Sequence, residues 1–216
     1  MEAAMFENNP PIKIDMNASP RKAHYEYFSS MAYPYVGVTV NVDITRLMEW
    51  RKASGAPFFL SLLYHAERAA NRVPELRRRI WQDEVIEFPW CPSSHTVAKP
   101  DGTYAYCVLN SNMPFEDFLP RARQAQEICR TSGTIEEDDS AVASLFISSV
   151  PWMTYTALVQ PVPCPADSNP RISWGKYTEE NGRITLPVSL LCHHALVDGL
   201  HIARFYEALD EELAKI

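Results

Sequence analysis

The C-terminal part of the chain shows the clearest change of hydrophobic pattern. Residues 186–192 are almost all apolar, which is typical of a strand buried on both faces. Beyond Gly199 the apolar residues recur every three or four positions with acidic residues between them, and this predicts an amphipathic helix. The junction carries His193, His194 and Asp198, so the sequence predicts a strand-to-helix turn that presents two imidazoles and a carboxylate.

The rest of the chain mixes helical and strand periods. Apolar spacing defines the segments, and Pro, Gly and Thr mark their ends, with Thr45 expected to cap the second helix. The predicted helices cover residues 21–32, 46–54, 58–73, 115–130 and 200–216. The predicted strands cover residues 35–44, 145–150, 171–177 and 183–192, with two or three more within 76–88 and 94–108.

Three stretches lack a regular pattern. Residues 1–20 are polar and predict an arm laid over the body, and the acidic residues 131–140 predict a solvated loop. Residues 160–170 predict an exposed loop, because their prolines lack the backbone donors of a central strand. The remaining chain, 21–216, predicts one α/β domain, a two-layer sandwich in which a mixed β-sheet is covered by helices.

Composition restricts the possible partners. The chain has 216 residues, enough for one domain with a sizeable core, and 46% of them are hydrophobic, as in ordinary globular proteins. The net charge of −7 disfavours nucleic acid or an anionic membrane as the main partner. An anionic ligand would need a local basic patch against that background.

The cysteines and the termini indicate a cytoplasmic protein. The five cysteines are odd in number and show no tight pairing pattern, which fits free thiols in a reducing compartment. The N-terminus lacks the basic and apolar regions of a signal peptide. No stretch approaches the roughly 18 apolar residues of a membrane span, so none is expected.

The histidine pair is the main candidate for chemistry. A neutral imidazole can take a proton from a hydroxyl, and on a strand at most one of His193 and His194 faces a cleft. Both rings can also be plain core residues. Asp198 can orient a ring, pair with a distant cation or cap the helix, and the spacing leaves these open. No metal is expected at His193, His194 and His201, since adjacent rings are poor ligands for one tetrahedral centre.

Residues 193–201, His-His-Ala-Leu-Val-Asp-Gly-Leu-His, resemble the His-His-Ala-x-x-Asp-Gly-x-His signature of chloramphenicol acetyltransferases. These enzymes belong to a wider class of coenzyme A-dependent acyltransferases that share His-x-x-x-Asp-Gly. The resemblance implies that His194 is the general base and Asp198 a structural aspartate. It extends from Arg21 onward, with landmarks at 42–45, 71–80 and 147–152. It departs at Leu191 and Leu200, where the family usually has glutamine and an aromatic residue.

The resemblance also implies roles outside the motif. Ser148 would stabilise the oxyanion of the tetrahedral intermediate, and Ser173 stands where a threonine often assists through water. Arg21 aligns with the arginine that the family pairs with the aspartate of the motif. Coenzyme A binding is implied for Trp152, Lys176 and Tyr177.

An acceptor pocket of aromatic and small polar residues is implied as well. Phe28 stands where a tyrosine is frequent, Val36 where a phenylalanine can stand, and Phe146 where an asparagine is common. These departures leave the catalytic chemistry untouched but leave the acceptor open. The implied pocket residues are Tyr27, Phe28, Val36, Thr96, Tyr104 and Phe146.

The expected function is acetyl-CoA-dependent O-acetylation of a small molecule, chloramphenicol or a related antibiotic, with a role in antibiotic resistance. The expected mechanism is direct transfer in a ternary complex, without an acyl-enzyme, because Cys192 and His193 face opposite sides of the strand. The resemblance implies a homotrimer with active sites between subunits. The alternatives are another alcohol acceptor and a non-catalytic binding protein of the same fold. The acyltransferase core of a dehydrogenase complex is disfavoured, because no lipoyl domain or linker is present.

Overall fold

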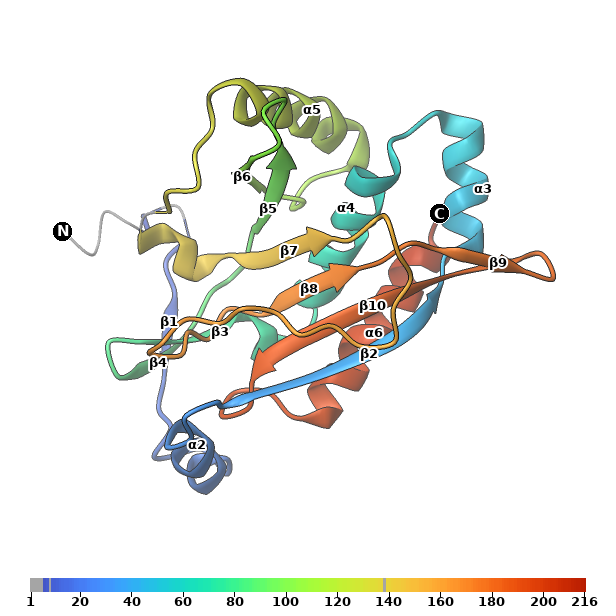
Figure 1. Ribbon diagram of the computed structural model, residues 1–216. Helices are drawn as coiled ribbons and strands as arrows, with labels where there is room; N and C mark the ends of the chain where they lie inside the picture. The colour runs from blue at the N-terminus through green and yellow to red at the C-terminus, as the bar shows by residue number, and fades with distance from the viewer. Residues whose placement is uncertain (1–5, 8, 138) are drawn as a thin grey trace.

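A seven-stranded mixed sheet forms the centre of the computed structural model, which describes residues 6–7, 9–137 and 139–216 (Figure 1). Its order is β2 (Tyr35–Asp43), β10 (Arg183–His193), β8 (Arg171–Trp174), β7 (Leu145–Ser149), β5 (Ser93–Ala98) and β6 (Tyr104–Leu109), and β9 (Thr178–Glu180) also pairs with β10. The β5–β7 and β7–β8 pairs are parallel and the others antiparallel. The long apolar strand predicted near the C-terminus is therefore an inner strand.

Helices α4 (Phe58–Asn71) and α6 (Gly199–Ala214) cover one face of this sheet and lie behind it in Figure 1. From its third residue onward α4 is buried except at Arg68, which explains its nearly continuous apolar sequence. The predicted mixed sheet covered by helices is confirmed. The core residues between the layers include Leu62, Leu63, Ile147, Ile172, Leu186, Val188, Leu190, Phe205 and Leu209, and the other helices are α2 (Lys22–Ser29), α3 (Thr45–Ser54) and α5 (Phe115–Ser132).

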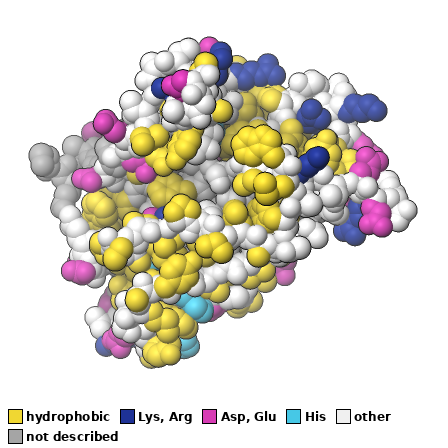
Figure 2. Space-filling model, viewed as in Figure 1, with side chains coloured by type: hydrophobic (Ala, Val, Ile, Leu, Met, Phe, Trp, Pro, Cys, Tyr) yellow, Lys and Arg dark blue, Asp and Glu magenta, His cyan; other side chains and the backbone are white. Residues whose placement is uncertain are grey.

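The opposite face of the sheet, called the outer face below, is turned toward the viewer in Figures 1 and 2. The segment that joins β7 to β8, residues 150–170, passes in front of it (Figure 1). Hydrophobic side chains are spread over much of this face (Figure 2). In a single chain, polar and apolar side chains on this face therefore remain accessible to solvent.

The expected N-terminal arm contributes a strand of its own. Residues Ile12–Ile14 form β1, which pairs with β4 (Glu84–Glu87), and β4 pairs with β3 (Arg78–Trp81). The arm is thus part of a three-stranded sheet and not only a covering segment. Residues 1–5 and Asn8 lie outside the described part of the chain.

Some predicted boundaries were wrong. Residues 76–108 hold four strands, β3 to β6, where two or three were expected. Helix α3 begins at Thr45, so Thr45 is its first residue and the N-cap position is Ile44, which supplies no side-chain cap. The amide of Thr45 donates to the carboxylate of Asp43 at 2.9 Å. The strand expected over 171–177 ends at Trp174, because the amide of Lys176 donates to the carbonyl of Met153 at 2.8 Å.

The proline-rich stretch 160–170 is exposed over most of its length but buried at its end. Ser168 accepts a hydrogen bond from the amide of Ile80 at 2.8 Å. The side-chain amide of Asn169 donates to backbone carbonyls of residues 141, 142 and 144, the nearest at 2.8 Å. These polar contacts hold the end of the segment against the sheet. The hydrophobic pattern of the sequence does not predict this burial, because the buried residues are polar.

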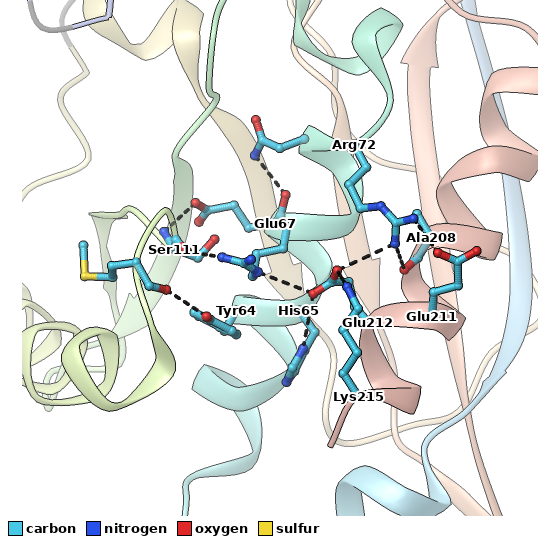
Figure 3. A network of polar contacts seen from close by, with 12 residues as sticks. Tyr64, His65, Glu67, Arg72, Ser111, Ala208, Glu211, Glu212 and Lys215 are labelled. Carbon is cyan, nitrogen blue, oxygen red and sulfur yellow. Dashed lines mark hydrogen bonds and ion pairs between the residues drawn. The ribbon is translucent and has the colours of Figure 1, made fainter.

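An ionic network joins α4 to the end of α6 (Figure 3). Glu212 of α6 is buried and pairs with Arg68 at 3.4 Å, with Arg72 at 3.7 Å and with Lys215. Burial alone would raise the pKa of Glu212, but the cations outweigh it and hold the pKa below its usual value. Burial lowers the pKa of His65 to about 4, so this neighbour of Glu212 is neutral at pH 7. The network fixes α6, whose first residue follows Asp198.

Arg79 joins the small sheet to the large one. Its side chain is fully buried and donates to the carbonyls of Leu76 at 2.9 Å, Val142 at 2.8 Å and Ser144 at 3.0 Å. These carbonyls belong to segments that are far apart in sequence. One guanidinium therefore satisfies several buried acceptors at the start of β7.

We expect Arg79→Leu to lower the free energy of unfolding by about 3 kcal/mol or more, because it leaves several buried carbonyls without a donor. Denaturant unfolding at fixed protein concentration measures the loss. Arg204→Leu removes an exposed arginine of α6 and is the matched control. Equal unfolding midpoints for the two variants would contradict the assignment of Arg79.

Candidate active site

The ring of His194 is held by the turn that follows β10. Its Nδ1 lies 2.9 Å from the carbonyl oxygen of Val197. A carbonyl can only accept, so the proton of the neutral ring is on Nδ1 and the lone pair is on Nε2. The backbone amide of His194 donates to the carbonyl of Pro34 at 2.7 Å, which ties the turn to the segment before β2. The half-buried ring can therefore take a proton at Nε2.

A second restraint comes from α2. The ring of Phe28 stacks on the imidazole of His194, with centroids 3.8 Å apart and planes at 18°. Its neighbour Tyr27 is exposed, and the two rings meet edge to face at 5.1 Å. Two of the expected pocket residues thus lie beside the expected base. Together the stack and the bond to Val197 leave the imidazole one orientation.

His193 points the other way, as strand geometry predicts. It is buried against the edge of Tyr35, with ring centroids 5.8 Å apart, and its Nδ1 accepts the amide of Ala195 at 3.3 Å. Burial lowers its pKa to about 4. Neutral and enclosed at pH 7, it is a packing residue in this fold.

Asp198 holds the turn. Its carboxylate pairs with Arg21 and accepts the amide of Leu200 at 3.0 Å, and its own amide donates to Nδ1 of His201 at 3.1 Å. Partial burial would raise the pKa of Asp198, but the bond from Arg21 and the other partners keep it below its usual value. It both pairs with a distant cation and caps α6, two roles that the spacing left open. No described contact joins its carboxylate to the His194 ring.

Ser148 and Ser173 lie side by side on the parallel strands β7 and β8, with hydroxyl oxygens 2.8 Å apart. Ser173 is fully buried, whereas Ser148 is partly exposed on the outer face. If Ser148 donated, the buried proton of Ser173 would lose its acceptor. The favoured arrangement has Ser173 donating to Ser148, and the proton of Ser148 then points to solvent or to a ligand. The help through water that the resemblance implies for Ser173 stays a prediction.

A row of hydroxyl groups extends this pair across the sheet. Tyr155 donates to the backbone carbonyl of Ser173 at 3.1 Å and accepts from Ser189 at 3.3 Å. The hydroxyl of Thr39 lies 2.7 Å from that of Ser189, so Thr39 is the donor in this last bond. Gly175 leaves room for Tyr155, because a Cβ there would lie 2.9 Å from its ring. Sequence reasoning missed this row, whose members come from β2, β10 and the segment after β7.

Ser148 and His194 of one chain are far apart. Ser148 is in register with Ser173, and Ser173 with Ser189, five residues before His194 on β10. Five residues along a strand and two strand spacings across the sheet separate the residues by roughly 19 Å. One acyl carbonyl cannot touch both side chains within a single chain.

The expected acceptor residues divide in the same way. Tyr27 and Phe28 lie beside His194, whereas Thr96, Tyr104 and Phe146 lie on β5, β6 and β7 with Ser148. Val36 is opposite Cys192, so its side chain points to the helix-covered face and packs against the core. The structure therefore places two halves of a site in different parts of one chain, one at the turn that follows β10 and one on the outer face at β5, β6 and β7.

Phe146 has a partner that sequence reasoning missed. The guanidinium of Arg171 lies 5.4 Å from the ring of Phe146 and 5.9 Å from that of Tyr35. It is buried and forms two bonds with the carboxylate of Asp167, at 2.8 and 2.7 Å. The bidentate pairing compensates its charge. Phe146 is thus part of a packed cluster next to the Ser148–Ser173 pair.

The residues expected to hold coenzyme A lie beyond the ends of β7 and β8. Trp152 is 79% exposed, Lys176 is exposed, and Tyr177 meets the ring of Phe58 at 6.0 Å. Lys and Arg side chains gather at the upper right of Figure 2. Two nearby cavities, of about 630 and 450 Å³, are lined by residues of both charges. The first has Arg51, Lys52, Glu49 and Glu179, and the second has Arg123, Arg130 and Glu127.

Comparison with known proteins identifies the family. The family model of chloramphenicol acetyltransferase matches residues 11–210. The chain is 30% identical to a chloramphenicol acetyltransferase of Clostridium perfringens, over 92% of this chain and 96% of that protein. It is 27% identical to chloramphenicol acetyltransferase 3 of Escherichia coli, over 92% and 95%.

Solved structures share the fold. A chloramphenicol acetyltransferase superposes with a TM-score of 0.83 at 24% identity, over 94% of this chain and 100% of the other. The dihydrolipoamide acetyltransferase (E2p) of Azotobacter vinelandii follows with a TM-score of 0.67 at 20% identity, over 95% and 97%. The fold is that of the acyltransferases, and the chain is an enzyme of this class. It belongs to the chloramphenicol acetyltransferase family, as residues 193–201 predicted.

Two negative findings concern the described residues only. No helix among them is long and apolar enough to cross a membrane. Within the same part of the chain, no group of three or more His, Cys, Asp or Glu side chains is arranged to hold a metal ion.

We expect Arg21→Ala to lower the free energy of unfolding by about 1–2 kcal/mol at pH 7 and to slow turnover, because it releases Asp198 and the turn at His194. The ion pair keeps the pKa of Asp198 below the usual 3.8. Its contribution is therefore present at neutral pH, and it is lost as the pH falls below about 4. Unfolding at pH 7 and at pH 3.5 measures the difference.

Lys22→Ala is the control for this variant, since it removes an exposed pair with Glu26 at 3.8 Å on the same helix. Unchanged unfolding together with an unchanged rate in Arg21→Ala would reject the role of the Arg21–Asp198 pair.

Proposed function

We propose that the protein transfers an acetyl group from acetyl-CoA to a hydroxyl of a small molecule, with chloramphenicol or a related antibiotic as the first candidate acceptor. The observation that carries the proposal is the 2.9 Å contact between Nδ1 of His194 and the carbonyl oxygen of Val197, which leaves the lone pair of the neutral ring on Nε2. Family membership supports the reaction type. On this basis the protein confers resistance by acetylating the drug in the cytoplasm.

In the proposed mechanism both substrates are bound together. Nε2 of His194 takes the proton of the acceptor hydroxyl while the hydroxyl oxygen attacks the thioester carbonyl. The hydroxyl of Ser148, oriented by Ser173, donates to the oxyanion. As the C–S bond breaks, the imidazolium returns its proton to the departing thiolate, so that the ester and coenzyme A leave a neutral ring.

A covalent acyl-enzyme is not part of the proposal. The cysteine nearest in sequence to the histidine pair, Cys192, is buried on the helix-covered side, and burial raises its pKa. A thiol with a raised pKa is a poor nucleophile. Phe28 supports the direct route, because its ring face favours the imidazolium that forms during transfer.

We further propose that the site is completed between copies of the chain in a homotrimer. His194, Phe28 and Tyr27 of one copy would face Ser148, Thr96 and Tyr104 of the next. The distance of roughly 19 Å between His194 and Ser148 within one chain supports this arrangement. Closed symmetry would repeat the same pairing at every interface.

His194→Ala is expected to lower kcat by roughly 10²–10⁴-fold, since no other described group stands ready to take the proton. Thiol release from acetyl-CoA in the presence of chloramphenicol and a panel of other alcohols measures the rate. Equilibrium binding of acetyl-CoA should persist in the variant and reports that the fold is intact. Undiminished acceptor-dependent thiol release in His194→Ala would reject the mechanism.

Co-expression of His194→Ala chains with Ser148→Ala chains tests the shared site. In mixed trimers some interfaces receive an intact His194 from one chain and an intact Ser148 from the next. Random mixing gives about a quarter of all sites this composition, and activity should rise to that fraction of the wild-type rate.

The two variants purified separately and mixed without exchange of subunits provide the baseline. Activity of co-expressed trimers no higher than this baseline would contradict a site built from two chains.

A further inference from the structure

A cavity of about 330 Å³ opens on the outer face beside β5 and β6. It forms because the acidic segment after α5 returns along the free edge of β6, where the amide of Tyr106 donates to the carbonyl of Thr134 at 2.9 Å. The proposed function does not use this cavity. Its lining residues are Phe6, Asn9, Pro92, Ser94, Tyr106, Val108, Glu136, Glu137, Ser140, Ala141, Ala143 and Ser144.

The cavity lies next to the proposed oxyanion donors. Ser94 is in register with Phe146 on the neighbouring parallel strand, and Phe146 precedes Ser148 by two residues on the same face. Two residues along β7 and one strand spacing place Ser94 about 8 Å from Ser148. An acceptor whose hydroxyl attacks a carbonyl held at Ser148 can therefore extend into the cavity.

The lining is acidic and aromatic. Glu136 and Glu137 contribute two carboxylates, and the hydroxyl of Ser94 donates to Oε1 of Glu137 at 3.2 Å. No Lys, Arg or His is among the described residues that line the cavity. At the same edge of the sheet, the rings of Tyr104 and Tyr106 lie 6.0 Å apart on the outer face.

The charges differ between the two ends of the outer face. In Figure 2 carboxylates lie along the left, whereas at the right Lys and Arg side chains gather with carboxylates among them. The guanidinium of Arg171 stands in the same row as Ser94, but the two bonds with Asp167 compensate its charge. The proposed coenzyme A end thus carries charges of both signs, whereas the described lining of this cavity carries carboxylates alone.

We propose that the acceptor is an alcohol that carries a cationic group, such as a substituted ammonium, about 8 Å from the reacting hydroxyl. Carboxylates and tyrosine faces are the groups that recognise ammonium ions, and the cavity offers both. The proposal rests on the proposed acetyl transfer and names its substrate class.

Three alcohols of matched shape test the charge preference. They are benzyl alcohols with a para substituent that is trimethylammoniomethyl, isobutyl or carboxylate, and the quaternary nitrogen cannot itself be acetylated. At low salt we expect kcat/KM to be roughly tenfold higher for the cation than for the neutral alcohol, and lowest for the anion. The preference should shrink as ionic strength rises.

The double variant Glu136→Gln/Glu137→Gln should bring the cation-to-neutral ratio of kcat/KM close to one. Glu207→Gln, which neutralises an exposed glutamate of α6, is the matched control and should keep the wild-type ratio. A preference that the double variant leaves unaltered would overturn the assignment to this cavity.

The outcomes separate this inference from the function on which it rests. If neutral and cationic alcohols are used equally, and transfer still depends on His194, the charge preference is wrong and the transferase proposal stands. If no alcohol, chloramphenicol included, supports His194-dependent thiol release, the proposed function fails, and the acceptor class fails with it.

Discussion

The hydrogen bond from Nδ1 of His194 to the carbonyl of Val197 is the interaction on which the proposed chemistry depends. It decides which ring nitrogen keeps a lone pair, and it exists only while residues 194–197 keep their turn. That turn is tied down at both ends. The amide of His194 donates to Pro34, and Asp198 pairs with Arg21 while it caps α6. The ionic network around Glu212 fixes the far end of the same helix (Figure 3).

The regular sheet has a second consequence. Because strands are stiff and the register is fixed, the distance between Ser148 and His194 cannot be closed by side-chain rotation. One chain therefore carries two half-sites, and each half has its own rigid support. For Ser148 the support is the pair with Ser173, and for His194 it is the turn and the stacked ring of Phe28.

The sequence predicted much of the fold and the motif, but fewer of the contacts. The apolar run of β10, the amphipathic α6 and the buried α4 were readable because their hydrophobic periods are strong. The short strands between residues 76 and 108 were undercounted, since strands of four to six residues give little periodic signal. The acceptor for Nδ1 of His194 is a backbone carbonyl. Every residue has such a carbonyl, so the sequence cannot show which one accepts the bond.

Long-range polar contacts explain the other omissions. Arg171 and Asp167 are four residues apart in the sequence and form an ion pair. The two rings that Arg171 also contacts, those of Tyr35 and Phe146, come near it only when the sheet forms. The cavity lined by Glu136 and Glu137 likewise arises from the return of a segment that looked like a plain solvated loop. In both cases the sequence shows the residue types but not the residues that they contact in the fold.

The hydroxyl row shows how a polar sheet face can be covered without leaving buried groups unpaired. Thr39 donates to Ser189, Ser189 to Tyr155 and Tyr155 to a backbone carbonyl, so each proton along this line is used. The hydroxyl of Ser173 donates its hydrogen bond to Ser148. Within this row the proton of Ser148 alone is left for a ligand. A partner subunit or a substrate can therefore cover the face at little desolvation cost, while the hydroxyl of Ser148 keeps a proton for the carbonyl that it is proposed to bind.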